Sequence, residues 1–197
     1  MPRRKTQFVQ GGYYHLYNRG AGRQSIFRVD EDYTQALYLL KEVSTLCQIK
    51  VIAYCLLPNH YHWLVRQDGS APVSLLPKRV FGSYTRVFNR RHERSGTLFE
   101  DRFEARPVNG DEYLRHLCCY IHANPVRHGI AAGPDLWPYS NYLEWIDARI
   151  GTLLDRAVIQ AFFGDGRHYR QRMSDYLAGL ITLPPALRTA LDALEGE

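Results

Sequence analysis

Two histidines separated by one residue, His60 and His62, are the first candidates for chemistry in this sequence. If their segment is a strand, residues two apart point to the same face, about 6–7 Å apart along the backbone. Two imidazoles placed in this way can converge on one metal ion, and imidazole suits Mn, Fe, Co, Ni, Cu or Zn better than Mg or Ca. Tyr61 would then face the opposite side, into the core. The alternative interpretation is a pair of surface histidines without a ligand, because the pattern is short.

A second candidate is Tyr120, which lies four residues before Asn124. The two side chains share one face if their segment is helical, and His116 lies one turn earlier. A tyrosine hydroxyl can attack a phosphodiester if a metal polarises the phosphate and a base or the metal site assists deprotonation. The amide oxygen of Asn124 could supply a third metal ligand. The alternative for Tyr120 is a core tyrosine whose hydroxyl is hydrogen-bonded.

Basic residues concentrate in the first half of the chain. The net charge is +5, yet residues 1–100 hold 15 Lys+Arg against 7 Asp+Glu, whereas residues 101–197 hold 10 against 13. Most of the basic residues are Arg, whose planar fork matches phosphate oxygens and guanine edges. This distribution favours a polyanionic partner. A genome whose codon usage favours Arg is the alternative explanation.

The four cysteines show no CxxC spacing, and the adjacent Cys118 and Cys119 are poorly placed for a structural disulfide. The pattern is typical of unpaired thiols in a reducing cytosol. We find no signal peptide and no run of 18 apolar residues, so we expect a cytoplasmic protein without a membrane span.

The elements that must hold the two candidate sites follow from hydrophobic periodicity. An aromatic, partly alternating strand is expected at 13–18, and a helix capped by Asp30 is expected over 31–47. The apolar run 50–57 predicts a buried strand, and 60–66 predicts the next one. The Pro-Asn turn between these two strands indicates an antiparallel hairpin.

An amphipathic helix is expected over about 74–93. Its apolar face would hold Val80, Phe81, Tyr84 and Phe88, and its other face would hold Arg79, Arg86, Arg90 and Arg94. No acidic residue on that face pairs with these arginines, which favours a binding surface. An ordinary solvated face is the alternative.

A further strand is expected over 97–108, followed by a turn and a helix that Asp111 caps and Pro125 ends. Two short helices are expected at 155–163 and 168–180. The order of elements predicts an α+β fold, a ferredoxin-like β-α-β-β-α-β sandwich with an antiparallel sheet, a tyrosine-bearing helix and C-terminal helical additions.

We divide the chain into a flexible basic arm at 1–10, a catalytic domain at 11–145 and a C-terminal helical extension at 146–197. This division rests on composition and on the positions of the motifs. The extension carries no motif that predicts a role.

Four motifs, in order, resemble one known family. YHLYNRGAGRQSIF (14–27), PNHYHWLV (58–65), GTLFEDRF (96–103) and YIHANPVR (120–127) are similar to segments of the single-tyrosine HUH transposases of the IS200/IS605 type, and the fit is closest to their REP-associated relatives. The resemblance covers residues 8–145.

The resemblance implies roles for the candidate residues. His60 and His62 match the two histidines that bind a divalent metal ion, Mg²⁺ or Mn²⁺, and Tyr120 matches the nucleophile. Asn124 matches the polar residue that can complete the metal site, where the insertion-sequence enzymes commonly carry Gln. Our candidate phosphate contacts are Arg3, Arg4, Lys5, Arg19, Arg79, Arg86, Arg90, Arg94 and Arg102.

The substrate implied by the family is single-stranded DNA folded into REP-like hairpins, which the enzyme nicks and rejoins through a 5′-phosphotyrosine. Two alternatives stay open: a hairpin-DNA-binding regulator that kept the fold without the chemistry, and a metal hydrolase unrelated to DNA. The sequence also leaves open whether the site is complete in a monomer or takes Tyr120 from the other chain of a homodimer.

Overall fold

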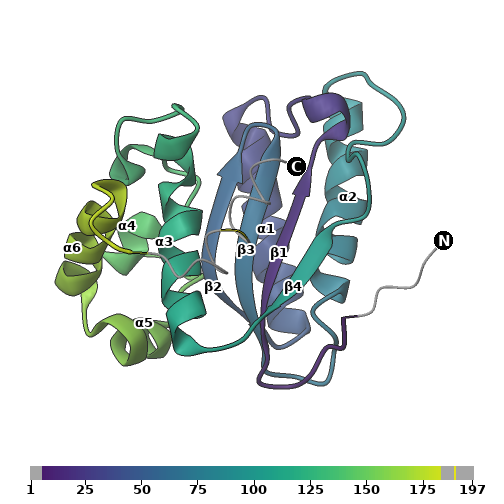
Figure 1. The fold of residues 1–197 in the computed structure, drawn as a ribbon. Coiled ribbons are helices and arrows are strands. Elements are labelled where there is room, and N and C mark those ends of the chain that lie inside the picture. Colours follow the sequence, from purple (N-terminus) through teal and green to yellow (C-terminus); the bar gives the residue numbers. More distant parts are fainter. Residues whose placement is uncertain (1–5, 183–188, 190–197) are drawn as a thin grey trace.

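Four strands form one antiparallel sheet in the middle of the molecule (Figure 1). The computed structural model describes residues 6–182 and 189. The strands are β1 (Tyr13–Arg19), β2 (Ile49–Leu57), β3 (His60–Gln67) and β4 (Glu104–Val108), in the spatial order β2-β3-β1-β4. Every neighbouring pair is antiparallel. This order confirms the predicted ferredoxin-like α+β fold.

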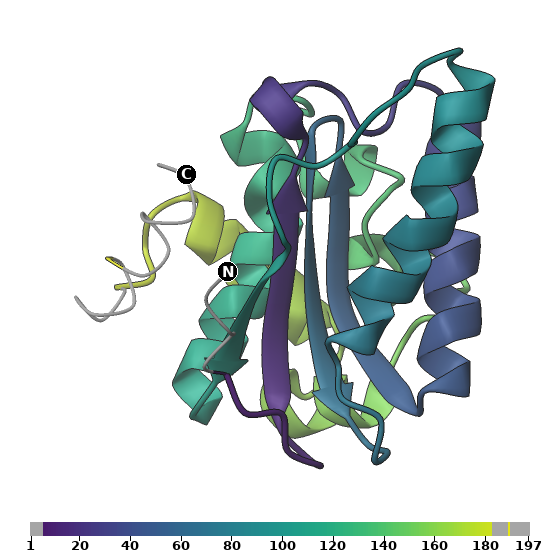
Figure 2. The ribbon, with the colours of Figure 1, turned by 90° about the vertical axis from the view of Figure 1, so that its right-hand side faces the viewer.

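Helices cover both faces of the sheet (Figures 1 and 2). On one face lie α1 (Asp30–Leu46) and α2 (Leu75–Arg91), and on the other lie α3 (Asp111–Arg127), α4 (Tyr142–Trp145), α5 (Arg156–Phe163) and α6 (Gly166–Leu177). Two short 3-10 helices, η1 (Ala21–Arg23) and η2 (Pro134–Leu136), lie in the connections. None of the helices in the described part of the chain is long and apolar enough to cross a membrane.

Strand β3 separates the core from the candidate site by simple alternation. Tyr61, Trp63 and Val65 are fully buried in the core beneath α1 and α2. His60, His62 and Leu64 point to the other face, toward α3. The expectation that Tyr61 enters the core while the two histidines share the opposite face is therefore confirmed.

The strand predicted over 97–108 is shorter than expected. Only Glu104–Val108 forms a ladder with β1, because the pairing ends where Tyr17 meets Glu104. Residues 97–103 form a loop that is anchored by two backbone hydrogen bonds, from Ala21 to Leu98 (3.0 Å) and from Glu100 to Arg19 (3.1 Å). The ladder with β1 therefore does not extend into residues 97–103.

Helix α3 does not end at Pro125, as we predicted, but continues to Arg127. A proline this close to a helix end removes only one backbone hydrogen bond, the one to residue i−4. The carbonyl oxygen of Pro125 also accepts from the backbone N–H groups of Ile130 (2.8 Å) and Ala131 (3.1 Å), which completes the end of the helix.

The predicted caps at Asp30 and Asp111 were each placed one residue late, since the N-cap positions are Val29 and Gly110. At the start of α1 the carboxylate of Asp32 does the capping instead. It accepts from the backbone N–H groups of Arg28 (2.9 Å) and Val29 (3.3 Å).

Asp32 also joins the two helices on that face of the sheet. Its carboxylate is fully buried and binds the side chains of Arg91 and His92, at the end of α2. Burial alone would raise the pKa of this carboxyl. The Arg28 backbone N–H and the side chains of His92 and Arg91 donate hydrogen bonds that outweigh burial and hold this pKa below its ordinary value.

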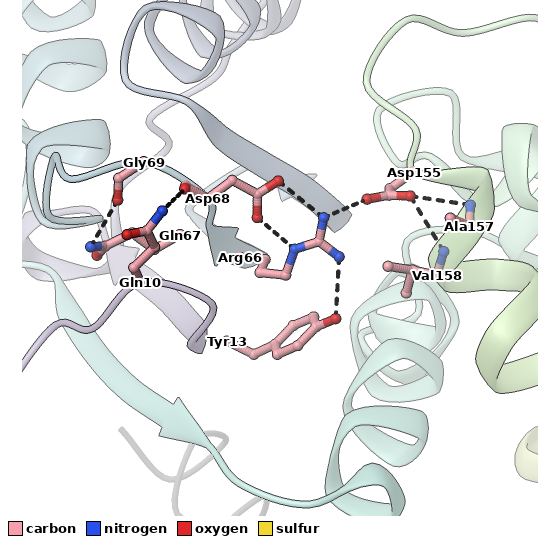
Figure 3. Close-up of polar contacts among 9 residues, drawn as sticks. All are labelled: Gln10, Tyr13, Arg66, Gln67, Asp68, Gly69, Asp155, Ala157 and Val158. Carbon is pink, nitrogen blue, oxygen red and sulfur yellow. Dashed lines mark hydrogen bonds and ion pairs between the residues drawn. The ribbon is translucent and has the colours of Figure 1, made fainter.

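Helix α5 is attached to the sheet by polar contacts around Arg66 on β3 (Figure 3). Its guanidinium binds Asp68 (2.6 Å) and Asp155 (3.1 Å). Asp155 in turn caps α5, accepting from the backbone N–H groups of Ala157 and Val158. The two short helices that we predicted at 155–163 and 168–180 are present as α5 and α6. Both pack against α3 in one hydrophobic core.

We predict that Asp32→Ala lowers the free energy of unfolding by about 3 kcal/mol, because it leaves Arg91 without its buried partner. The wild-type protein should lose this contribution as the pH falls below about 4, since a carboxyl whose folded pKa is depressed stabilises only while it is ionised. Urea unfolding at several pH values measures both effects. Glu31→Gln, at the exposed neighbouring position, is the control and should change neither the stability nor its pH dependence.

Candidate active site

The structure brings the two histidines and the tyrosine together within one chain. The imidazole rings of His60 and His62 lie 5.2 Å apart between centroids. The ring of Tyr120, on α3, lies 5.5 Å from that of His62 and nearly perpendicular to it. Both Tyr120 and His62 are buried, because α3 packs its apolar side on this face of the sheet.

These rings lie at the edge of a cleft of about 740 Å³. The end of β1, the turn between β2 and β3, and the 100–106 segment form its walls, and Tyr120 and His128 on α3 and just beyond it also line it. Arg19 and Arg102 lie in this wall, as do Arg23 and Arg106. Three acidic side chains also line it, and one of them, Glu100, pairs with Arg19 (3.3 Å). The cleft is therefore polar and mixed in charge, with arginine as its commonest charged residue.

Each histidine of the pair has one ring nitrogen engaged. Nδ1 of His60 donates to the side-chain oxygen of Asn59 (2.7 Å), and Nδ1 of His62 shares a hydrogen bond with Nε2 of His15 (3.0 Å). An amide oxygen only accepts, so the Asn59 bond leaves Nε2 of His60 with its lone pair. This is the arrangement by which proteins orient metal-binding histidines.

The pair is kept neutral by its surroundings. Burial, followed by the nearby charges of His128 and Arg19, lowers the pKa of His60 to about 3. Burial also lowers the pKa of His62 well below its ordinary value, and the neighbouring imidazoles add to the shift. A neutral imidazole is the form that binds a metal ion.

Asn124, one turn after Tyr120, is fully buried and is not among the residues that line the cleft. Its side-chain nitrogen donates to the backbone oxygen of Tyr120 (2.8 Å). Its side-chain oxygen is buried and has no hydrogen-bond partner among the residues described. Within the same part of the chain no group of three or more His, Cys, Asp or Glu side chains could hold a metal ion. An ion at the histidine pair would thus need amide, water or phosphate oxygens as its remaining ligands.

Tyr120 has a cation over its ring. The guanidinium carbon of Arg127 lies 5.5 Å from the centroid of that ring. His116, one turn before Tyr120, is buried and faces Glu112 (3.7 Å).

Sequence reasoning missed three aromatic residues of this site. His15 and Tyr17 on β1 point to the same face as His62, with ring centroids 5.1 and 5.8 Å from it. His128 follows α3, and its ring lies 5.0 Å from that of His60. The spacing of His15 and Tyr17, two apart on a predicted strand, was a usable signal. The spacing of His128, eight residues after Tyr120, was another.

The candidate phosphate contacts separate into groups. Arg79, Arg86 and Arg90 lie on the exposed side of α2, across the sheet from the cleft. Arg94 is engaged locally, with Asn89 (3.0 Å) and the Thr97 carbonyl oxygen (3.1 Å). Arg3, Arg4 and Lys5 lie outside the described residues.

Comparison with known proteins identifies the class. Residues 8–124 match the family described as "Transposase IS200 like", which is more than half of the chain. The chain therefore belongs to the IS200-like transposase family.

Individual relatives agree with this class. A protein of Haemophilus influenzae named "Putative REP-associated tyrosine transposase" is 28% identical over 116 residues, which is 51% of this chain and 63% of that relative. The match thus spans less than two thirds of the relative's length.

One solved structure shares the fold. A REP-associated tyrosine transposase bound to a REP hairpin superposes with a TM-score of 0.61 at 18% identity, covering 79% of this chain and 94% of the other. A putative transposase from Deinococcus radiodurans gives a TM-score of 0.43 at 16% identity, covering 59% and 93%. The resemblance to REP-associated tyrosine transposases noted from the motifs is therefore confirmed.

Proposed function

We propose that this transposase nicks and rejoins single-stranded DNA next to hairpins, with Tyr120 as nucleophile and a divalent metal ion held by His60 and His62. The observation that carries the proposal is the 5.5 Å separation of the His62 and Tyr120 rings, at the edge of a polar cleft within a single chain. We therefore propose a site that one chain completes, in a monomer or in each chain of a dimer.

The residues present define what a metal ion would do. Nε2 of His60 and of His62 would hold it, with the side-chain oxygen of Asn124 as our third ligand. A bound Mg²⁺ or Mn²⁺ supplies positive charge that offsets the negative charge developing on the phosphate during displacement.

Tyr120 performs the covalent step. Its oxygen attacks phosphorus, the new O–P bond forms as the bond to the 3′ oxygen breaks, and the phenol proton passes to water in the cleft. The 3′ oxygen takes up a proton and leaves as a hydroxyl. The 5′-phosphotyrosine keeps the energy of a phosphodiester, so the reverse attack by a 3′-hydroxyl rejoins strands without ATP.

The arginines of the cleft would hold the strand on either side of the reacting phosphate. We assign this role to Arg19 and Arg102, which line the cleft with Tyr120. We assign Arg79, Arg86 and Arg90 to DNA beyond it, since they lie across the sheet. A DNA substrate and four free thiols favour the cytoplasm as the compartment.

We predict that Tyr120→Phe abolishes covalent attachment, because it removes the attacking oxygen. The measurement is a denaturing gel of protein incubated with a labelled REP-type hairpin carrying a single-stranded flank, in Mn²⁺. Wild type should form a denaturation-resistant adduct. Tyr113→Phe, on the same helix and half-buried, is the matched control and should form the adduct normally.

Cleavage by Tyr120→Phe at the wild-type rate would contradict the assignment of Tyr120 as the nucleophile. Hairpin binding by wild type without any cleavage would instead indicate a DNA-binding regulator.

We predict that His60→Ala and His62→Ala each weaken Mn²⁺ binding by more than about 100-fold, beyond the 10–100-fold typical of outer-shell partners. Electron paramagnetic resonance of free Mn²⁺ in the presence of the DNA-free protein gives the dissociation constants. His168→Ala, at an exposed position of α6, is the control and should bind as wild type does. Unchanged binding in both site variants would exclude this pair as the metal site.

We predict that replacing Arg79, Arg86 and Arg90 together by Ser weakens hairpin binding but not the cleavage of DNA already bound. Each lost phosphate contact should reduce the slope of log affinity against log salt by about one. Filter binding at several salt concentrations measures the slope, and single-turnover cleavage at saturating protein measures the chemistry. Arg102→Ala should weaken hairpin binding and also slow cleavage, since Arg102 lines the cleft. An unchanged salt slope in the triple variant would remove α2 from the DNA surface.

A further inference from the structure

His15 is a fully buried histidine in the middle of β1 to which the proposed mechanism gives no role. Its Nε2 lies 3.0 Å from Nδ1 of His62, and the two rings stack with centroids 5.1 Å apart. A separation of 3.0 Å between two ring nitrogens is a hydrogen bond.

A hydrogen bond between two neutral imidazoles holds a single proton, so one ring must donate and the other accept. If His62 donates from Nδ1, its Nε2 carries the lone pair that a metal ion needs. If His15 donates from Nε2, the proton of His62 is on its own Nε2, and that atom cannot bind a metal ion. The direction of this one bond decides whether His62 is a competent ligand.

The other histidine of the pair has a partner that allows only one direction. Asn59 presents an amide oxygen to Nδ1 of His60 at 2.7 Å, and that oxygen can only accept. His15 occupies the equivalent position behind His62 but is able to donate or accept. Each ring of the pair thus has a hydrogen-bond partner at Nδ1. For His60 it is the Asn59 amide, and for His62 it is the buried imidazole of His15.

We infer that His15 is a positioning residue that accepts a hydrogen bond from Nδ1 of His62 and so holds His62 in its metal-binding tautomer. The inference rests on the proposed function, because it concerns the same metal site. The inference also determines which atom of His15 carries the ring proton. In this state Nδ1 of His15 carries the proton, although that atom is buried and has no hydrogen-bond partner among the described residues.

Two substitutions separate this role from simple packing. His15→Phe keeps a ring that can stack against His62 but removes the acceptor, whereas His15→Gln loses the ring but places an amide oxygen that can accept. The measured quantity is the Mn²⁺ dissociation constant of the full chain without DNA. We expect His15→Phe to weaken binding by about 10–100-fold, as removal of an outer-shell partner does, and His15→Gln to stay within about threefold of wild type.

A histidine on the opposite face of the sheet provides the matched control. His92, at the end of α2, is hydrogen-bonded to the buried carboxylate of Asp32 (2.8 Å). His92→Phe should lower thermal stability without changing Mn²⁺ affinity. Equal Mn²⁺ affinity in wild type and His15→Phe would overturn the inference. So would weaker binding by His15→Gln than by His15→Phe, since that order indicates that only the ring matters.

A second measurement uses the wild-type chain and does not depend on a variant folding. Nitrogen-15 NMR of histidine-labelled protein with saturating Zn²⁺ should show Nδ1 of His62 protonated and Nε2 of His15 unprotonated. The opposite pattern in the zinc-bound protein would overturn the role of His15 while leaving the metal site intact. Failure of wild type to bind Mn²⁺ or Zn²⁺ would overturn the proposed function and the inference together.

Discussion

The packing of α3 across the sheet positions everything that the proposed chemistry needs. This contact places Tyr120 against His62. A buried polar network on the side of α3 away from the sheet site stabilises the position of the helix. Nε2 of His122 donates to the side-chain oxygen of Asn141, and Nδ1 accepts from the hydroxyl of Tyr169 on α6. Asn141 in turn accepts from the backbone of Tyr54 on β2. A fully satisfied buried network of this kind specifies a single arrangement. The helices after residue 146 therefore support the tyrosine helix as well as the fold.

The same burial that fixes these side chains also sets their protonation. His15, His60 and His62 lie close together, and a second or third positive charge among them would be unfavourable. The rings are therefore neutral, and the proton positions on them follow from their partners. The arginines are arranged differently, at the cleft wall and on outer helix faces, where water offsets their charge. The fold thus places neutral imidazoles inside and guanidinium groups outside.

Much of the fold could be predicted because buried strands and amphipathic helices have distinct hydrophobic periods. The H-x-H and Tyr-x-x-x-Asn spacings also indicated which side chains share one face of a strand or helix. What could not be predicted depends on the pairing of distant segments. Residues 97–103 hydrogen-bond to Arg19 and Ala21, but the ladder with β1 does not continue into them. His15 joins the site only through the register of β1 with β3. Periodicity also identified the arginine face of α2, but it cannot tell on which side of the sheet a helix packs.

We propose that one chain assembles the histidine pair and the tyrosine around a single divalent ion. The most direct test is a crystal structure grown with Mn²⁺, with the ion located by its anomalous scattering. We predict one strong peak within bonding distance of Nε2 of His60 and of His62, with Tyr120 of the same chain beside it. A peak at another site, or a histidine pair whose neighbouring tyrosine belongs to a second chain, would contradict it.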